Sequence, residues 1–281
     1  MQVFNEIAPL KAFLKGQKQA GKSIGLVPTM GALHEGHLAL VQASKAENHL
    51  TVATIFVNPT QFNNPADLER YPRTLDKDRA LLEKVECDIV FSPDADHMYE
   101  SEALVRFDFG HLDKVMEGRF RPGHFSGVAL VVSKLFNIVE PDRAYFGQKD
   151  WQQFVIISQL VKELKFNLEL VSIPTFREAD GLAMSSRNAR LTGEQREKAS
   201  VFQAALKFAK MALKSGRAFD EVSMEVRRRV ESSDFITLEY FEIADSKNLN
   251  LIDNVKAANR PIMCIAGFVG EVRLIDNMFL D

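Results

Sequence analysis

Two histidines, His34 and His37, stand three residues apart in the segment PTMGALHEGH, which follows the apolar run Ile24–Thr29. A buried strand that leads through a turn into a helix presents backbone N–H groups and the positive end of the helix dipole, and both favour an anion. The spacing lets both imidazoles face one side of the first helical turn. They could donate hydrogen bonds to phosphate oxygens and stabilise negative charge that develops on a departing pyrophosphate.

The histidine pair has two other interpretations. The first is a pair of ordinary surface histidines at a helix start. The strand–turn–helix context argues against it, because Gly31 permits a sharp turn and Gly36 lets a ligand approach the backbone closely. The second is a metal site, which is weaker still, because the spacing is not that of H-E-x-x-H and no third ligand is evident.

A second polar segment, FVNPTQF, comes directly after the β-branched run Leu50–Val57. The carboxyl ends of neighbouring parallel strands share one edge of a sheet, so Asn58 and Gln61 are expected to face the same crevice as the histidines. Neutral amides suit a small ligand that carries hydroxyl and carboxylate groups. The alternative is that Asn58-Pro59 is ordinary turn chemistry.

The segment YFGQKDWQQ repeats this order, with a strand end, a glycine, polar residues and then a helix. Lys149 would supply a positive charge for phosphate, and Gln153 would lie in the first turn of the new helix, facing the crevice. The simpler alternative is that Asp150 only caps the helix and Lys149 is solvated.

A further polar segment, READGLAMSSRN, spans Arg177–Asn188. Its two hydroxyls, Ser185 and Ser186, precede the guanidinium of Arg187, and together they could bind a triphosphate from the side opposite the histidines. A serine-capped helix start with a solvated arginine is the simpler alternative. The glycine-flanked loop EGRFRPGHFSG adds three possible phosphate contacts, Arg119, Arg121 and His124.

Strands and helices alternate along the first part of the chain, which predicts an α/β fold with a Rossmann-like, doubly wound parallel sheet over residues 1–175. The pattern then changes to two helices, Glu194–Ser215 and Phe219–Ser232, followed by three strands, Thr237–Ile243, Arg260–Val269 and Glu271–Phe279. A glycine between the last two strands predicts an antiparallel hairpin. Residues 176–281 are therefore expected to form a smaller C-terminal α+β domain that acts as a lid, with a hinge at about residues 176–192.

Composition restricts the class of protein. The chain has 281 residues, a formal net charge of −3 and a pI near 6.1, which argues against a chain-wide surface for nucleic acid. Cys87 and Cys264 are too far apart to suggest a disulfide framework or a metal site, so a reducing compartment is expected. No apolar stretch has the length of a membrane span and no signal peptide is recognised, which predicts a cytoplasmic protein without membrane partners.

Taken together, the segments resemble those of the pantothenate synthetase family, ligases of the nucleotidylyltransferase superfamily. Six motifs carry the resemblance in order along nearly the whole chain: PTMGALHEGH, FVNPTQF, YPRT, RPGHFSGV, FGQKDWQQ and READGLAMSSRN. An H-x-G-H motif alone would indicate only ATP chemistry, whereas the complete series is far more specific. No segment departs from the pattern strongly enough to suggest an inactive enzyme.

The resemblance implies ATP-dependent condensation of (R)-pantoate with β-alanine through a pantoyl adenylate, with release of AMP and pyrophosphate. It also implies Mg²⁺ with ATP, a cytoplasmic homodimer and a place in coenzyme A biosynthesis. His37 would be the proton donor, with His34 and Lys149 as the other catalytic residues. Pantoate would bind at Gln61 and Gln153, with β-alanine near Gln61, and Asn58 and Thr29 complete the expected substrate site. The expected ATP contacts are Met30, Gly31, Ala32, Leu33, His34, Glu35, Gly36, His37, Gly147, Gln148, Lys149, Asp150, Phe176 through its backbone, Met184, Ser185, Ser186 and Arg187.

Two alternatives to this function remain. Another adenylyl transferase of the same superfamily would act on a phosphorylated substrate, and it would need more cationic groups than the neutral Asn58, Gln61 and Gln153 supply. A non-catalytic nucleotide-binding protein would not be expected to keep both histidines, Lys149 and the SSRN segment. The Mg²⁺ ligands are not evident from the sequence, although Asp76 and Asp78 after YPRT are candidates.

Overall fold

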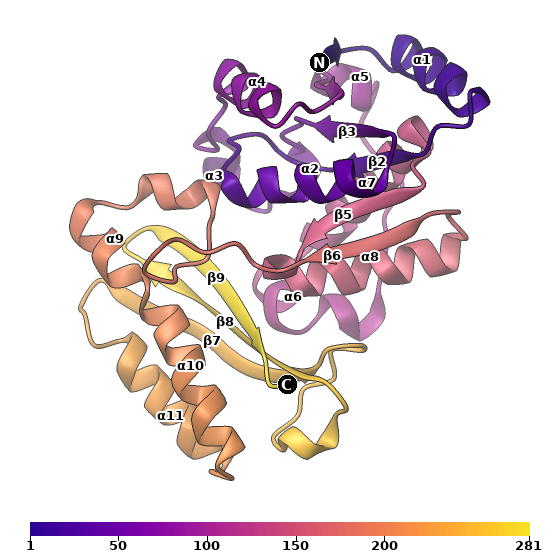
Figure 1. Cartoon of the computed structure of the whole chain (residues 1–281). Helices are drawn as coiled ribbons and strands as arrows, with labels where there is room; N and C mark the ends of the chain where they lie inside the picture. The colour runs from indigo at the N-terminus through magenta and orange to yellow at the C-terminus, as the bar shows by residue number, and fades with distance from the viewer. The chain divides into compact units, whose positions relative to one another are not determined.

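The computed structural model describes residues 1–281, and its contacts divide the chain into two compact units (Figure 1). The first unit contains residues 1–114, 118–147 and 156–174. The second contains residues 115–117, 148–155 and 175–281. Two short segments thus leave the N-terminal half of the chain to join the C-terminal unit, and Gln148–Val155 is the longer of them.

The first unit is built on a six-stranded parallel sheet, which confirms the predicted fold class (Figure 1). Its strands lie in the order β1-β4-β3-β2-β5-β6. The strand bounds are β1 Gln2–Phe4, β2 Ile24–Val27, β3 Leu50–Thr54, β4 Ile89–Phe91, β5 Arg143–Gly147 and β6 Glu169–Ile173. Because β2 pairs with β3 on one side and with β5 on the other, the chain order reverses at β2. In such sheets ligands bind at the carboxyl end of that strand, where the PTMGALHEGH segment begins.

Helices cover this sheet, whose inner strands β2 and β4 are apolar and buried, as parallel sheets require. The long helices of the N-terminal half are α1 Ile7–Gln19, α2 Glu35–Glu47, α4 Leu75–Lys84, α7 His124–Val139 and α8 Trp151–Leu164, and the short ones are α3 Pro65–Glu69, α5 Ala95–Met98 and α6 Met116–Phe120. Helix α2 packs against β2, β3, β5 and β6, and α1 packs against α7. None of these helices, nor any other in the chain, combines the length and apolar character needed to span a membrane.

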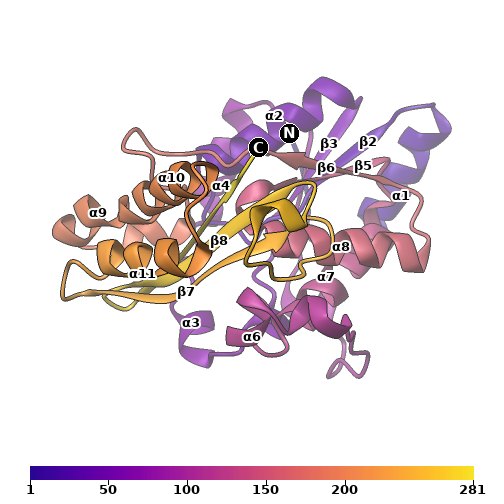
Figure 2. The same cartoon turned by 90° about the horizontal axis from the view of Figure 1, so that it is seen from below.

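The second unit contains a three-stranded antiparallel sheet in the order β7-β8-β9 (Figure 1). Helices α9, α10 and α11 belong to the same unit (Figure 2). Its elements are α9 Gly193–Ala199, α10 Val201–Lys214, α11 Phe219–Val230, β7 Ile236–Asp245, β8 Pro261–Val269 and β9 Val272–Phe279. Helices α10 and α11 pack against each other and against the sheet, and their apolar faces form one core with it. The predicted glycine turn joins β8 to β9, since Gly270 has a φ of 58° and Val269 pairs with Val272.

Several predicted boundaries were wrong. The single helix predicted over Glu194–Ser215 is divided at Ser200, whose ψ of −9° departs from helical geometry, so α9 ends and α10 begins there. Strand β3 ends at Thr54 rather than Val57, although the N–H groups of Ile55 and Phe56 still donate to Phe91 of β4 and to Thr29 after β2. The prediction also missed the edge strand β1 and helix α1, whose polar residues weaken its apolar pattern.

The packing of α7 gives a stability prediction. A Cβ atom at Gly127 would lie 2.2 Å from the backbone oxygen of Thr60, which neither segment can relieve by rotating a side chain. We expect Gly127→Ala to lower the free energy of unfolding by about 1–3 kcal/mol, as overpacked substitutions do. Gly16→Ala in α1 is the matched control, since no atom lies within 4 Å of its Cβ position, and it should gain up to about 1 kcal/mol from helix propensity. Urea unfolding measures both, and equal effects would contradict the packing argument.

Candidate active site

The two histidines begin helix α2 and lie against each other. His34 is the N-cap residue, and its backbone N–H donates to Nδ1 of His37 at 3.3 Å. The ring centroids are 4.0 Å apart with an interplanar angle of 34°. The three-residue spacing therefore does bring the imidazoles together at the start of a helix, at the carboxyl side of β2, where an anion is favoured.

A buried carboxylate holds the turn that precedes these histidines. Asp78, from the first turn of α4, is 1% exposed, and its two oxygens accept hydrogen bonds from the backbone N–H groups of Ala32 at 2.9 Å and Leu33 at 2.8 Å. The turn needs this support because Gly31 and Ala32 both have positive φ, 78° and 49°. A left-handed Ala is a strained conformation that persists only where its surroundings fix it.

The amide segment lies beside this turn. Nε2 of Gln61 donates to Sδ of Met30 at 3.0 Å, so the structure brings together two of the predicted segments. Oε1 of Gln61 accepts from Nδ2 of Asn58 at 3.1 Å. Gln61 is 7% exposed and belongs to the short 3₁₀ helix Pro59–Gln61.

Asn58 itself is 1% exposed and uses both ends of its amide within the chain. Its Nδ2 donates to Gln61 and to the backbone oxygen of Gly127, and its Oδ1 accepts from Thr60 and, at 2.7 Å, from the Tyr99 hydroxyl. Thr29 is similarly engaged, since its hydroxyl donates to the backbone oxygen of Thr54. These contacts orient Gln61 and the turn.

His124 supports the same segment from α7. Its Nδ1 lies 2.8 Å from the backbone oxygen of Gln61, and the side chain is 6% exposed. A ring nitrogen at this distance donates to the carbonyl in the tautomer that protonates Nδ1. The sequence suggested His124 as a possible phosphate contact, and in the structure its ring lies against the backbone oxygen of Gln61.

In the second unit, the 3₁₀ turn Gln148–Asp150 that carries Lys149 is held by strand β9. Nδ2 of Asn277 donates to the backbone oxygens of Gln148 at 2.8 Å and Lys149 at 2.7 Å, and Asn277 is 6% exposed. Gln153 follows in the first turn of α8 and is half-buried. Nothing in the sequence pattern links Asn277 to this turn, more than a hundred residues earlier.

Burial affects how tightly Lys149 holds its proton. It lowers the pKa of the ammonium, because the charged form loses hydration, and the positive charge of Arg187 lowers it further. Asp150, Asp276 and Glu117 oppose this shift by favouring the charged form. Lys149, which the sequence predicts as a phosphate-binding cation, thus loses its proton at a lower pH than an ordinary lysine.

Asp276, the residue that precedes Asn277 in β9, fixes the segment at residues 176–188. Arg177 forms a two-bond ion pair with Asp276, at 2.6 and 2.8 Å, and Asp276 is 4% exposed. Phe176 is 43% exposed, and its backbone oxygen accepts from the N–H of Met184 at 3.0 Å. Ser185 caps the 3₁₀ helix Ser186–Arg190 by accepting from the N–H of Arg187, so the capping alternative is part of its role.

Neither cysteine suits covalent catalysis. Cys87 and Cys264 are free and buried. Burial raises the pKa of the Cys87 thiol to about 11 and that of Cys264 above its ordinary value. Since the thiolate is the nucleophile, both side chains are inert at neutral pH.

Comparison with known proteins identifies the family. The profile of the family described as Pantoate-beta-alanine ligase matches residues 2–279. The chain is 48% identical over 278 residues to the pantothenate synthetase of Bacteroides fragilis strain ATCC 25285, covering 99% of this chain and 98% of that protein. The chain belongs to the pantoate–β-alanine ligase family.

Solved structures of the family have the same fold. The pantothenate synthetase of Thermus thermophilus superposes with a TM-score of 0.93 at 40% identity, over 100% of this chain and 99% of that one. The ligase of Francisella tularensis, crystallised with beta-gamma ATP and beta-alanine, gives a TM-score of 0.84 at 35% identity, over 100% and 98%. The sequence predictions of fold, family and activity are therefore confirmed: this member of the family is an ATP-dependent ligase that joins pantoate to β-alanine.

The predicted site residues fall into two sets. The first unit holds Thr29, Met30, Gly31, Ala32, Leu33, His34, Glu35, Gly36, His37, Asn58, Gln61 and Gly147. The second holds Gln148, Lys149, Asp150, Gln153, Phe176, Met184, Ser185, Ser186 and Arg187. The supporting residues Asp78, Asp276 and Asn277 were not predicted in these roles. Their only sequence signal is a polar residue within an apolar periodic pattern.

Asp78 and Asp76 allow a matched test of the histidine turn. Asp78→Asn replaces one acceptor oxygen with an NH₂ group that faces a backbone N–H, so a buried donor loses its partner. We expect a loss of about 1–3 kcal/mol in the free energy of unfolding and a marked fall in kcat. Asp76→Asn, on the same helix but exposed, should alter neither quantity. Urea unfolding and steady-state kinetics of both variants measure this, and equal behaviour would show that Asp78 does not hold the turn.

Proposed function

We propose that the reaction proceeds in two steps through a pantoyl adenylate. The carboxylate of pantoate attacks the α-phosphorus of ATP, and pyrophosphate leaves in line with it. The amine of β-alanine then attacks the acyl carbon, AMP leaves, and the amine loses a proton. A free carboxylate is a poor electrophile, so transfer of AMP gives the acyl group the leaving group that it lacks.

The residues expected at the nucleotide act by position and charge. His34 and His37 donate to phosphate oxygens at the start of α2, with His37 as the proton donor, and Lys149 offsets negative charge on the departing pyrophosphate. Residues 30–37, 147–150 and 184–187, with the backbone of Phe176, bind ATP. Little covalent chemistry falls to the protein in this type of transfer.

Pantoate and β-alanine are assigned to the neutral amides. Gln61 and Gln153 bind pantoate, with β-alanine near Gln61, while Asn58 and Thr29 act by orienting Gln61 and the turn. A neutral amide leaves the carboxylate nucleophilic, whereas a two-bond arginine contact would compete with the attack. The observation that carries this assignment is the 3.0 Å contact between Gln61 and Met30, since it joins a predicted pantoate residue to the predicted ATP turn.

We assign Mg²⁺ to the phosphates of ATP rather than to a site made by protein. No group of three or more His, Cys, Asp or Glu side chains in residues 1–281 is arranged to hold a metal ion. Both oxygens of Asp78, a candidate from the sequence, are engaged by Ala32 and Leu33. Magnesium often relies on phosphates and water, and there it would neutralise the charge of the nucleotide.

The remaining assignments concern the cellular location, the oligomeric state and the motion of the C-terminal domain. We propose a cytoplasmic homodimer in which the C-terminal α+β domain, residues 176–281, works as a lid about a hinge at residues 176–192. Two free, buried cysteines support a reducing compartment. Closure of a lid would keep water from the reactive adenylate.

Product analysis tests the reaction. Purified protein is mixed with ATP, Mg²⁺, pantoate and β-alanine, and each component is omitted in turn. We expect AMP and pantothenate together only with all four present, and pyrophosphate with an enzyme-bound adenylate when β-alanine alone is omitted. Pyrophosphate released without pantoate would refute the adenylate route, because ATP would then react with another acceptor.

The lowered pKa of Lys149 predicts a pH effect. The lysine binds phosphate as the ammonium, so the contact is complete below its pKa and is lost as pH rises through it. Because that pKa is below the ordinary value for lysine, the KM for ATP should rise at a less alkaline pH than an ordinary lysine would give. Lys149→Arg, which stays charged, should move this rise to higher pH, whereas Lys162→Arg in α8 should not. KM profiles between pH 7 and roughly 10.5, near the ordinary lysine value, measure this, and coincident profiles for the chain and Lys149→Arg would contradict it.

A further inference from the structure

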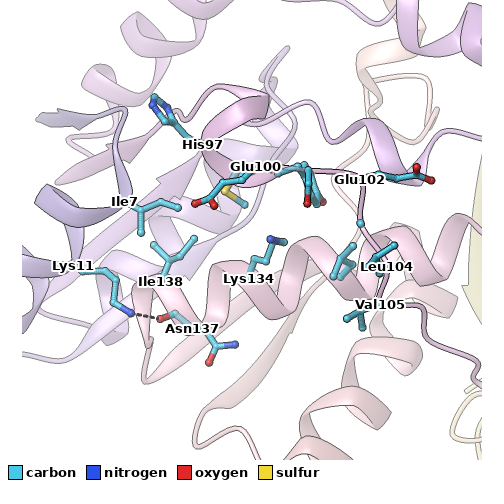
Figure 3. A pocket seen from close by; sticks show the side chains of 15 residues that line it. Ile7, Lys11, His97, Glu100, Glu102, Leu104, Val105, Lys134, Asn137 and Ile138 are labelled. Atoms are coloured by element: carbon cyan, nitrogen blue, oxygen red, sulfur yellow. Dashed lines mark hydrogen bonds between the residues drawn. The ribbon is translucent and has the colours of Figure 1, made fainter.

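A pocket of about 550 Å³ in the first unit is not lined by the residues proposed to bind substrates (Figure 3). Its walls come from α1, α5, α7 and residues 99–105, and none of these belongs to the proposed ATP or pantoate sets. The proposed ATP segment Met184–Arg187 lies in the second unit, where the loop before it and helix α9 support it.

The loop before the ATP segment is a tight turn at residues 178–182. The N–H of Glu178 donates to the backbone oxygen of Leu182 at 2.9 Å, and the N–H of Gly181 donates to the backbone oxygen of Glu178 at 2.8 Å. The N–H of Leu182 donates in turn to Oδ1 of Asp180 at 3.1 Å. The turn therefore holds two acidic residues, Glu178 and Asp180, close together.

Arg196 of α9 bridges these two carboxylates. Its Nη1 donates to Oδ2 of Asp180 at 2.5 Å, and its Nη2 donates to Oδ1 of Asp180 at 3.2 Å and to Oε2 of Glu178. A guanidinium offers planar donors in a fixed arrangement for such a pattern, whereas an ammonium is a point charge and does not reproduce it. Without the arginine, two neighbouring negative charges would repel each other, and the side chain of Glu178, which is 24% exposed, would turn toward water.

Glu178 also contacts the helical turn that carries part of the ATP segment. Its other oxygen, Oε1, accepts from Nδ2 of Asn188 at 2.8 Å, and the same amide group donates to the backbone oxygen of Ala183 at 3.2 Å. Asn188 lies in the 3₁₀ helix Ser186–Arg190, which begins with two of the proposed ATP contacts. A series of side-chain contacts, Arg196–Glu178–Asn188, thus leads from α9 to the ATP segment.

We infer that Arg196 is a positioning residue for the ATP segment. It acts through Glu178 and Asn188, and it needs no contact of its own with a substrate. The inference rests on the ATP site proposed above and adds to it a residue from a helix outside that site. Partly exposed ion pairs contribute little to folding stability, whereas a small displacement of a group that binds the reacting phosphates lowers the rate strongly.

Three substitutions break the series: Arg196→Lys, Arg196→Gln and Glu178→Gln. Arg196→Lys keeps the charge but loses the planar fork, and Glu178→Gln leaves one acceptor oxygen for two donors. We expect kcat/KM for ATP to fall roughly tenfold or more in each variant. The kcat/KM for β-alanine should change little, because β-alanine attacks after pyrophosphate has left. Initial rates with the other substrates saturating give both ratios.

Further variants serve as controls. Asp180→Asn removes a partner of Arg196 that does not contact Asn188, so its effect should be clearly smaller than that of Glu178→Gln. Lys198→Gln removes an exposed charge from the same helix and should alter neither ratio. Asn188→Ala should resemble Arg196→Gln, and the double variant should be no worse than Asn188→Ala alone, because both substitutions break the same series.

Circular dichroism and urea unfolding verify that each variant is folded. Glu178→Gln replaces a single atom, so it keeps the test available if an arginine variant does not fold. Equal losses in both ratios would indicate a smaller active fraction rather than a displaced ATP segment, and they would overturn the inference. Wild-type kinetics for Arg196→Lys would also overturn it, as would losses that add in full when Arg196→Gln and Asn188→Ala are combined.

Arg187→Ala separates this inference from the proposed function. If that variant keeps the wild-type kcat/KM for ATP, the ATP segment itself is refuted. If the ratio falls in Arg187→Ala but stays at the wild-type value in Arg196→Gln, only the positioning role of Arg196 is refuted.

Discussion

The site in the first unit depends on the two hydrogen bonds from Ala32 and Leu33 to the carboxylate of Asp78. They satisfy backbone donors that the left-handed turn at Gly31 and Ala32 leaves without a regular partner. A Cβ atom at Gly31 would come within 3.0 Å of Oδ2 of the same carboxylate, so the turn and its support also fit each other sterically. The start of α2, and with it both imidazoles, follows directly from this turn. The buried carboxyl group is tolerated here because its oxygens accept hydrogen bonds from two backbone N–H groups and from the hydroxyl of Thr74.

Strand β9 serves the second unit in a comparable way. Asp276 forms an ion pair with Arg177, while the side chain of Asn277 donates hydrogen bonds to the turn at Lys149. These two consecutive residues thus fix two predicted ATP segments that are far apart in sequence. Burial raises the pKa of Asp276, while the guanidinium of Arg177 opposes that rise. Removal of the arginine would leave a buried carboxylate without its cation, which is a costly arrangement. Strand β9, which contributes to the apolar core of this unit, thus also carries two polar residues that position segments outside that core.

The sequence predicted what local pattern and spacing determine. The alternation of strands and helices indicated the parallel sheet, and the H-x-x-H spacing predicted that His34 and His37 would lie together. Asp78 was considered only as a metal ligand, because a carboxylate more than forty residues from the turn carries no local sign of its partners. The break at Ser200 was missed because no glycine or proline marks it anywhere in residues 194–215. Contacts between distant segments and local deviations of ψ are set by packing, and single-sequence patterns do not record packing.

In each unit, exposure separates the supporting polar residues from the proposed phosphate ligands. Asn58, Asp78 and Asn277 are each at most 6% exposed and use their polar atoms within the chain. His34, Lys149 and Arg187 are half-buried, so parts of them remain accessible to a substrate. A group that binds a phosphate must be accessible and must also hold one position. Long or rotatable side chains hold one position only when the backbone that carries them is fixed. The buried amides and carboxylates fix that backbone. Substitutions among them should therefore alter catalysis as strongly as substitutions of the residues proposed to bind the substrates.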